Sequence, residues 1–404
     1  MAASSKSDEA ERNPVQKAFL TAGLAAFLIV AVYIFTDSGL EHLALFAIGF
    51  AIGYTLLHAR FGFSSVYRQI VESGNTEMLR AHLLMLGLAA ALFSALFILE
   101  FGLGGAIPHP ALSPISVGLV LGSFMFGFGM EFGSGLAPAA LYRMEGARSA
   151  MLLTLLGFTS GATIGGAHFG FWNDSLPSSD AFSLAEDTPL GYFGALGILI
   201  IVFGLIGIIT YTYKLRQRPP ALPPLPTAAG WRKFFFGTWP LLVGASLLAI
   251  LNALVLFVQG EPWMLTASFT LWGSKIVNAV GISVGEWAYW EIQGEMHTLM
   301  LPLMSDSRSI LNIGVIIGAF VTLSLSGIIR FERPPFHIAI KALVGGTLMG
   351  YGATISFGAN VGAYFSGIAS FSLHAWIWTA MAIAGVYVAY FLEKKFDITK
   401  SQQR

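Results

Sequence analysis

A glycine pattern occurs twice in this chain, once in each half. The first copy, at 122–135, reads GSFMFGFGMEFGSG, and the second copy, at 345–358, reads GGTLMGYGATISFG. Four glycines of the two copies superpose without a gap at a constant separation of 223 residues, from position 122 to position 345. Repetition of one unit within an apolar chain is typical of transporters that are built from two homologous halves.

The composition indicates an integral membrane protein. Of the 404 residues, 55% are hydrophobic and 11% are charged, whereas soluble proteins have about 25% charged residues. The 22 basic and 22 acidic residues balance, which gives no argument for a nucleic-acid partner. The absence of cysteine excludes disulfides, thiolate metal sites and thiol catalysis.

The apolar stretches predict ten membrane spans, each close to the roughly 20 residues that cross a bilayer. The first span lacks the small-residue cleavage site of a signal peptide, so we expect it to be retained. The predicted spans are 18–36, 41–58, 81–103, 114–132, 149–168, 190–213, 234–258, 309–329, 338–357 and 372–392.

The charged residues of the loops predict the orientation of these spans. Basic residues concentrate in 59–80, in 214–233 and in the tail after 392, whereas 104–113 has no lysine or arginine. Because cytoplasmic loops are enriched in basic residues, we expect both termini and the linker 214–233 to be cytoplasmic in a prokaryotic inner membrane. The two glycine copies then cross the membrane in opposite directions, which predicts halves related by inversion.

We therefore predict an all-α polytopic membrane protein, an inverted structural repeat with broken or re-entrant short helices around a central pathway. The two halves are 41–168 and 234–392. The remaining segments are a disordered cytoplasmic N-terminus at 1–16, an extra transmembrane helix at 17–36, a connecting transmembrane helix at 190–213, a Pro-rich cytoplasmic linker at 214–233 and a cytoplasmic tail at 393–404.

Two further segments, 59–77 and 264–295, are half-apolar, and each has a glycine close to a serine. Irregular backbone at membrane depth is tolerated where protein encloses it or where it lines a wet cavity. We expect both segments to form re-entrant hairpins or short helices that face the pathway.

Each glycine copy also predicts a break in its helix. After Gly135 the helix can restart near Pro138, since proline suits a first helical turn. A restarting helix exposes N–H groups and a positive dipole end, which favour an anion at the membrane midplane. The alternative is that the glycines serve close helix packing alone.

Three segments resemble the YeeE/YedE family of bacterial sulfur-compound (thiosulfate) transporters, namely 122–142, 309–318 and 350–378. The resemblance extends over roughly 41–392 and implies an hourglass-like inverted repeat that passes thiosulfate or a related sulfur species. In the family, cysteines that follow the two glycine copies are thought to hand the anion along through S–H···S contacts. In this sequence those positions are Leu136 and Ala359, which have no thiol.

The candidate pathway residues are those near the two glycine copies and the two half-apolar segments: Ser64, Ser65, Glu131, Gly135, Leu136, Lys275, Gly358, Ala359 and Asn360. Lys275 interrupts an apolar run, and an ionisable residue at membrane depth usually faces a cavity, although a lysine at a helix end can also snorkel to the interface. Glu131 could carry a proton or pair with Lys275.

Other polar and aromatic residues have a topological explanation. Arg68, which follows Tyr67, either guards the cytoplasmic mouth or simply flanks a span on the inside. His374, Trp376 and Trp378 are expected in an aromatic belt at the outer interface.

These observations favour a transporter of a small sulfur-containing anion, with the lipid bilayer and a small cytoplasmic sulfur-carrier protein as further candidate partners. The alternative is a non-transporting or differently specific relative, because Leu136 and Ala359 replace the family cysteines. The segment GISVG at 281–285 matches a nucleophile motif, but it lacks the strand–turn–helix setting of that motif, so we predict no enzyme. No cofactor and no metal site is expected.

Overall fold

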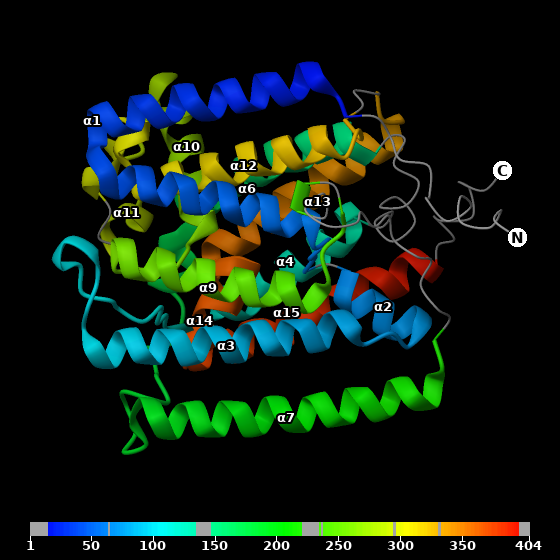
Figure 1. Ribbon diagram of the computed structural model, residues 1–404. Helices are drawn as coiled ribbons and strands as arrows, with labels where there is room; N and C mark the ends of the chain where they lie inside the picture. The colour runs from blue at the N-terminus through cyan, green and yellow to red at the C-terminus, as the bar shows by residue number, and fades with distance from the viewer. Residues whose placement is uncertain are drawn as a thin grey trace, which may run out of the picture.

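The computed structural model describes residues 15–63, 65–134, 147–219, 234–235, 237–293, 296–329 and 333–395. Within these ranges almost all regular structure is helical, and the long helices lie side by side in a bundle (Figure 1). The exception is a two-stranded antiparallel pair, β1 (Ile115–Ser116) with β2 (Ser178–Ser179). The prediction of a mainly α-helical chain is therefore confirmed, with this small sheet as an addition.

Eight helices of the described part are long and apolar enough to cross a membrane: α1 (Lys17–His58), α3 (Glu77–Leu99), α6 (Ala147–Asn173), α7 (Gly191–Gln217), α9 (Leu241–Gln259), α12 (Ser307–Leu325), α13 (Phe336–Ile355) and α15 (Leu373–Lys395). A shorter apolar helix, α4 (Val117–Ser134), contains the first glycine copy. The chain is a multi-pass membrane protein.

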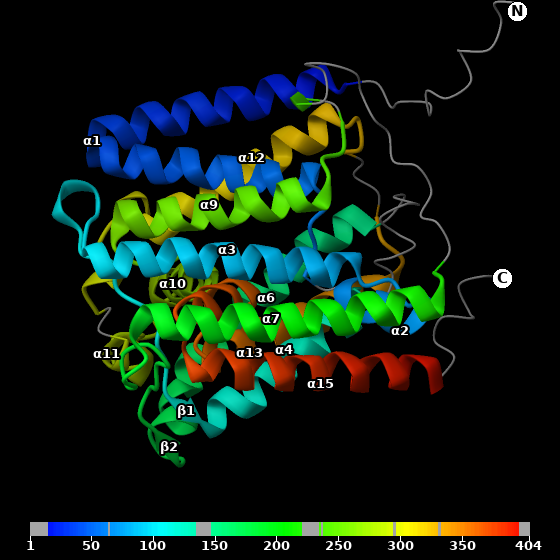
Figure 2. The ribbon, with the colours of Figure 1, turned by 60° about the horizontal axis from the view of Figure 1, so that its bottom comes forward.

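The short elements are η1 (Leu103–Gly105), α2 (Ser65–Ser73), α10 (Leu265–Ala279), α11 (Ala288–Ile292), η2 (Met296–Leu299), η3 (Leu303–Ser305), η4 (Asn360–Ser366) and α14 (Gly367–Ala369). Short helices thus form in both half-apolar segments. In Figure 2, α10 and α11 lie at one end of the bundle, together with β1 and β2, and α2 lies at the opposite end.

Helix α1 accounts for the first two predicted spans. It bends at Gly39, whose φ of 82° and ψ of −168° are not helical, and its two arms run antiparallel (Figure 1). Only glycine adopts this conformation without strain. The span predicted from 234 instead begins at Leu241, because Pro240 disfavours helical backbone at the residue before it.

The first arm of α1 and the whole of α7 lie at the edges of the bundle (Figure 1). Their apolar side chains are widely exposed, for example Ile29 on α1 and Phe193 and Ile208 on α7. Exposed aliphatic surface of this extent suits contact with lipid tails. These are the two spans that the sequence leaves outside the repeat.

The repeated glycines allow α4 and α13 to approach each other closely where they cross. A Cβ atom added at Gly122 would lie 2.6 Å from the carbonyl oxygen of Gly352, and one added at Gly352 would lie 2.3 Å from that of Gly122. A Cβ atom at Gly345 would lie 2.5 Å from Cα of Gly133. The two glycine copies therefore pack against each other, backbone to backbone.

Two other glycines of the repeat face outward from this crossing. A Cβ atom at Gly127 would lie 1.9 Å from the carbonyl oxygen of Ala382 on α15, and one at Gly350 would lie 1.9 Å from that of Phe158 on α6. Each glycine copy thus contacts two helices, which explains why glycine recurs at such short intervals.

Candidate functional site

The second glycine copy ends in a break of the backbone, as the sequence predicts. Phe357 and Gly358, which follow α13, have positive φ values of 62° and 154°, and the chain then resumes as the π-helical η4. A Cβ atom at position 358 would lie 2.6 Å from the backbone nitrogen of Ala363, so glycine is needed there. The corresponding positions of the first copy, Gly135 and Leu136, lie outside the described residues.

The indole of Trp378 holds this break. Its Nε1 donates to the hydroxyl of Ser356 at 3.1 Å and to the carbonyl oxygen of Gly358 at 3.1 Å. Trp378 is 2% exposed and His374, whose Nδ1 lies 2.6 Å from the hydroxyl of Ser372, is 1% exposed. The prediction that these two side chains belong to an interfacial belt is wrong, because both rings are buried and find hydrogen-bond partners inside the protein.

A wide cavity of about 220 Å³ lies on one side of the break. Thr354 and Gly358 contribute to it from the second glycine copy, and Thr266 contributes from α10. Arg308 also lines it, and its guanidinium pairs with Glu261 at 3.0 Å. The cavity has room for several water molecules.

A narrow cavity of about 10 Å³ has room for about one water molecule. It lies between α2, α3, α4, η4 and α15, and its lining residues are Phe63, Val66, Tyr67, His82, Met130, Asn360, Tyr364, Trp378 and Ala382. The amide Nδ2 of Asn360 lies 3.5 Å from Sδ of Met130. Gly358 borders the wide cavity and Asn360 borders the narrow one, so the broken segment contributes to both.

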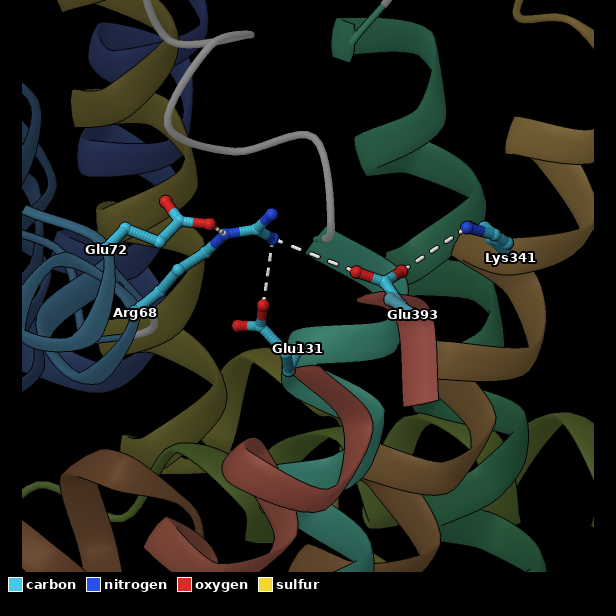
Figure 3. A network of polar contacts seen from close by, with 5 residues as sticks. All are labelled: Arg68, Glu72, Glu131, Lys341 and Glu393. Carbon is cyan, nitrogen blue, oxygen red and sulfur yellow. Dashed lines mark hydrogen bonds and ion pairs between the residues drawn. The ribbon is translucent and has the colours of Figure 1, made fainter. Parts of the chain in front are cut away.

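Arg68 and Glu131, which follow the lining residues Tyr67 and Met130 in the chain, belong to a network of charges (Figure 3). The guanidinium of Arg68 on α2 bonds Glu72 at 2.9 Å and Glu131 on α4 at 2.9 Å, and it lies 3.8 Å from Glu393 on α15. The other oxygen of Glu393 lies 3.3 Å from Nζ of Lys341 on α13. The network ties together four helices from both halves of the sequence.

The chemistry of Arg68 follows from these neighbours. Glu131 and Glu393 are buried, and a buried carboxylate is costly unless a cation and hydrogen bonds compensate it. Burial by itself would lower the pKa of the Arg68 guanidinium, but the carboxylates, Glu131 foremost, raise that pKa above its ordinary value. Tyr67, which precedes Arg68 in the chain, lines the narrow cavity.

Lys275 has a different environment from the one that its sequence context suggests. Its Nζ donates to the carbonyl oxygens of Leu299 at 2.8 Å and Leu301 at 2.7 Å. Glu131 pairs with Arg68, and not with Lys275. The structure therefore joins Lys275 to the backbone at the end of η2 and just after it, at the end of the bundle opposite α2.

The remaining candidates are distributed as follows. Ala359 is buried directly before η4, between residues that line the two cavities. Ser65 begins α2, and Ser64 lies outside the described residues. Within the described ranges no group of three or more His, Asp or Glu side chains is arranged to hold a metal ion.

Sequence reasoning overlooked His82, left Arg68 open between a guard of the cytoplasmic mouth and a cation that flanks a span, and placed Trp378 in an interfacial belt. A signal exists for His82, since it is the one titratable residue in the apolar run 81–99 of α3. For the other two the decisive partners, Glu131 and Gly358, are distant in the chain, and no local pattern indicates them.

Comparison with known proteins reveals a match to one protein family. A family model described as sulphur transport matches residues 58–388. Probable transporter YedE of Escherichia coli (strain K12) is 32% identical over 164 residues, which are 40% of this chain and 39% of that protein. The chain therefore aligns with well under half the length of that relative.

Two proteins named thiosulfate transporter TsuA align over a longer range. That of Spirochaeta thermophila is 26% identical over 341 residues, which are 84% of this chain and 94% of the relative. That of Escherichia coli (strain K12) is 22% identical over 352 residues, which are 85% and 92% of the two chains.

Proposed function

The chain belongs to the sulphur-transport family, and we propose that it carries a small, thiosulfate-like sulfur anion through a central pathway between two inverted halves. The observation that supports this most directly is the position of the break at Gly358, which lies between the wide and the narrow cavity. Discontinuous helices typically form the substrate sites of transporters that are built from inverted repeats.

The inverted relation of the halves is supported by matching helix contacts. Helix α13 packs against α6 as its counterpart α4 packs against α15, and α1 packs against α12 as α9 packs against α3. These pairs are the ones expected if a two-fold axis in the membrane plane relates 41–168 to 234–392.

A pair of side-chain contacts supports the same relation. Glu131 and Thr354 are 223 residues apart, the separation of the glycine copies. Glu131 bonds Arg68 on the short helix α2, and the hydroxyl of Thr354 lies 3.2 Å from that of Thr270 on the short helix α10. On this proposal α2 and α10 are re-entrant counterparts. An ion pair joins α2 to α4, and a contact between two hydroxyls joins α10 to α13.

The orientation of the pathway rests on charge. The described start of α1, the end of α7 and the end of α15 lie at the same end of the bundle as α2 (Figure 2). Basic side chains gather there, among them Lys214, Lys394 and Lys395. By the positive-inside rule this end is cytoplasmic, so the wide cavity opens toward the outside and the Arg68 network closes the inside.

Without thiols, the anion would meet neutral and cationic donors. Asn360 offers an amide at the narrow cavity, and Arg68 offers a guanidinium once its carboxylates separate from it. Guanidinium groups bind oxyanions well because their N–H groups match two acceptor oxygens. On this proposal the Arg68 network is both the inner gate and the first cationic contact on the cytoplasmic side.

A second candidate function keeps the fold without thiosulfate transport. It is favoured by the apolar residues Leu136 and Ala359 at the positions where the family has cysteines. Such a protein would carry another small anion or serve as a sensor or subunit.

The deciding experiment is uptake of radiolabelled thiosulfate into proteoliposomes, with sulfite and sulfate as competitors. We expect uptake above that of protein-free liposomes, and a strong reduction in Asn360→Leu, which keeps the size of the side chain but removes its donors. The variant Gly204→Ala on α7, where an added Cβ meets no atom within 4 Å, should transport normally. A folded protein without thiosulfate uptake would refute the proposal in favour of the second function.

A further inference from the structure

We propose that His82 is a proton-binding group of the narrow cavity and that it takes up a proton for each anion carried, so that transport is anion–proton symport. This inference rests on the proposed function. It adds the coupling ion and the residue that binds it, and it starts from one unsatisfied nitrogen atom.

The surroundings of His82 determine its tautomer. The side chain is 2% exposed, and its Nδ1 lies 2.9 Å from the carbonyl oxygen of Met78, one turn earlier on α3. A carbonyl oxygen can only accept, so Nδ1 carries a hydrogen. In the neutral ring Nε2 is then a free acceptor, and it has no hydrogen-bond partner among the described residues.

The narrow cavity provides space for a water molecule near His82. His82 lines the narrow cavity together with Asn360, Tyr67 and Tyr364, so the lining offers further polar groups. A buried acceptor without a partner is costly, and one water molecule, for which there is room, would satisfy it. A proton delivered through such a water needs no more space, whereas an anion requires the cavity to widen first.

Other titratable groups near His82 either have partners of their own or are phenols. On α3, Glu77 pairs with Lys214 of α7, and Arg80 lies over the ring of Tyr211. The groups that face the cavity from α2 and η4 are Tyr67 and Tyr364.

Phenols ordinarily titrate near pH 10, whereas imidazole titrates near neutrality. Helices α9 and α14, which also pack on α3, contain no titratable side chain. On α2, Arg68 is held by its carboxylates beyond Tyr67. Of the described side chains that line the narrow cavity, His82 is therefore the one whose group ordinarily titrates nearest to neutral pH.

An anion between the two cavities needs a compensating positive charge. Arg308, which lines the wide cavity, pairs with Glu261, and Arg68, which follows the lining residue Tyr67, pairs with Glu131. An anion that enters between the cavities is costly to bury unless a charge compensates it. An imidazolium at His82 provides that charge, and by reciprocity the anion favours its protonation.

The test uses purified protein in liposomes that contain a trapped pH indicator, with the membrane potential clamped by potassium and valinomycin. Thiosulfate added outside is fully ionised near neutral pH and carries no proton itself. We expect uptake to be accompanied by acidification of the lumen and to rise as the external pH falls. In His82→Gln, which cannot titrate, both the acidification and the pH dependence of uptake should be lost.

A second buried histidine provides the matched control. His58 also has Nδ1 near a carbonyl oxygen, that of Gly237 at 3.0 Å, and an Nε2 without a partner among the described residues. It lines neither the wide nor the narrow cavity. His58→Gln should therefore retain acidification and pH dependence.

The outcomes separate the two proposals. Thiosulfate uptake by the wild type without acidification would overturn the coupling and leave the proposed function standing, and this result does not depend on whether a variant folds. Acidification that persists in a folded His82→Gln would remove His82 from the coupling. Absence of any thiosulfate uptake by folded wild-type protein would overturn the proposed function and the coupling with it.

Discussion

Arg68 and Lys275 illustrate how the partner of a cation decides its role. Both lie on short helices between apolar spans, yet Lys275 bonds two backbone carbonyl oxygens whereas Arg68 bonds side-chain carboxylates. Backbone carbonyls are fixed by the fold, so the lysine stabilises a loop. Carboxylates on separate helices can move apart, so the arginine can release them and meet an anion.

Removal of the Arg68 guanidinium should destabilise the protein more than removal of its exposed partner. Arg68→Ala leaves the buried carboxylate of Glu131 without its cation and Glu393 with Lys341 alone, at a cost of about 3 kcal/mol. Glu72→Gln removes a partly exposed partner, for which we expect less than about 1 kcal/mol. Thermal unfolding in detergent measures both, and equal melting temperatures for the two variants would contradict the assigned compensation.

At the scale of helices, the crossing of α4 and α13 is the element that the glycine repeat encodes. Gly122 and Gly352 approach each other through their backbones, and Gly127 and Gly350 extend the same close packing to α15 and α6. Helices in lipid associate through such contacts because the hydrophobic effect gives no advantage to apolar burial there. Helix α13, which ends just before the break at Gly358, is therefore packed closely against α4 on one side and α6 on the other.

Gly352→Ala should separate these helices, because its Cβ would lie 2.3 Å from the carbonyl oxygen of Gly122. Neither atom belongs to a flexible side chain, so we expect a clear fall in melting temperature and reduced thiosulfate uptake. The matched substitution Gly204→Ala meets no atom and should stabilise α7 slightly, by about 0.5–1 kcal/mol. A Gly352→Ala protein as stable as Gly204→Ala would refute the packing explanation.

On the scale of the whole molecule, the two ends of the bundle differ in chemistry. The end that contains α2 has the ion network and the basic residues, and the end that contains α10 and α11 has the wide cavity. If the halves are inverted copies, this difference arises at equivalent positions, where Glu131 corresponds to Thr354. We infer that the asymmetry gives each side of the membrane its own gate.

The proposed topology predicts opposite results for two reporter fusions. A reporter that is active in the cytoplasm should be active when fused after residue 404, whereas a reporter that requires the periplasm should be active when inserted in 104–113. The physical reason is the excess of basic residues at the first end and their absence from the second segment. Activity of a periplasmic reporter fused after residue 404 would show that the end with the Arg68 network faces the periplasm, contrary to the proposed topology.

The sequence alone determined the membrane character, the spans and the glycines at which helices meet. These properties are local, since apolar length sets a span and a missing side chain permits close approach whatever the partner is. The small misplacements, such as the start of α9, come from single residues such as Pro240 that limit a helix end.

Only the tertiary structure decided which polar groups meet. Arg68 contacts Glu131 and Glu393 although they are far apart in the chain. Trp378 on α15 donates a hydrogen bond to the carbonyl oxygen of Gly358, in the break that follows α13. The free nitrogen of His82 is likewise visible only once its surroundings are known. Hydrogen bonds and ion pairs depend on distances of a few ångströms between segments, and those distances are set by packing and not by local pattern.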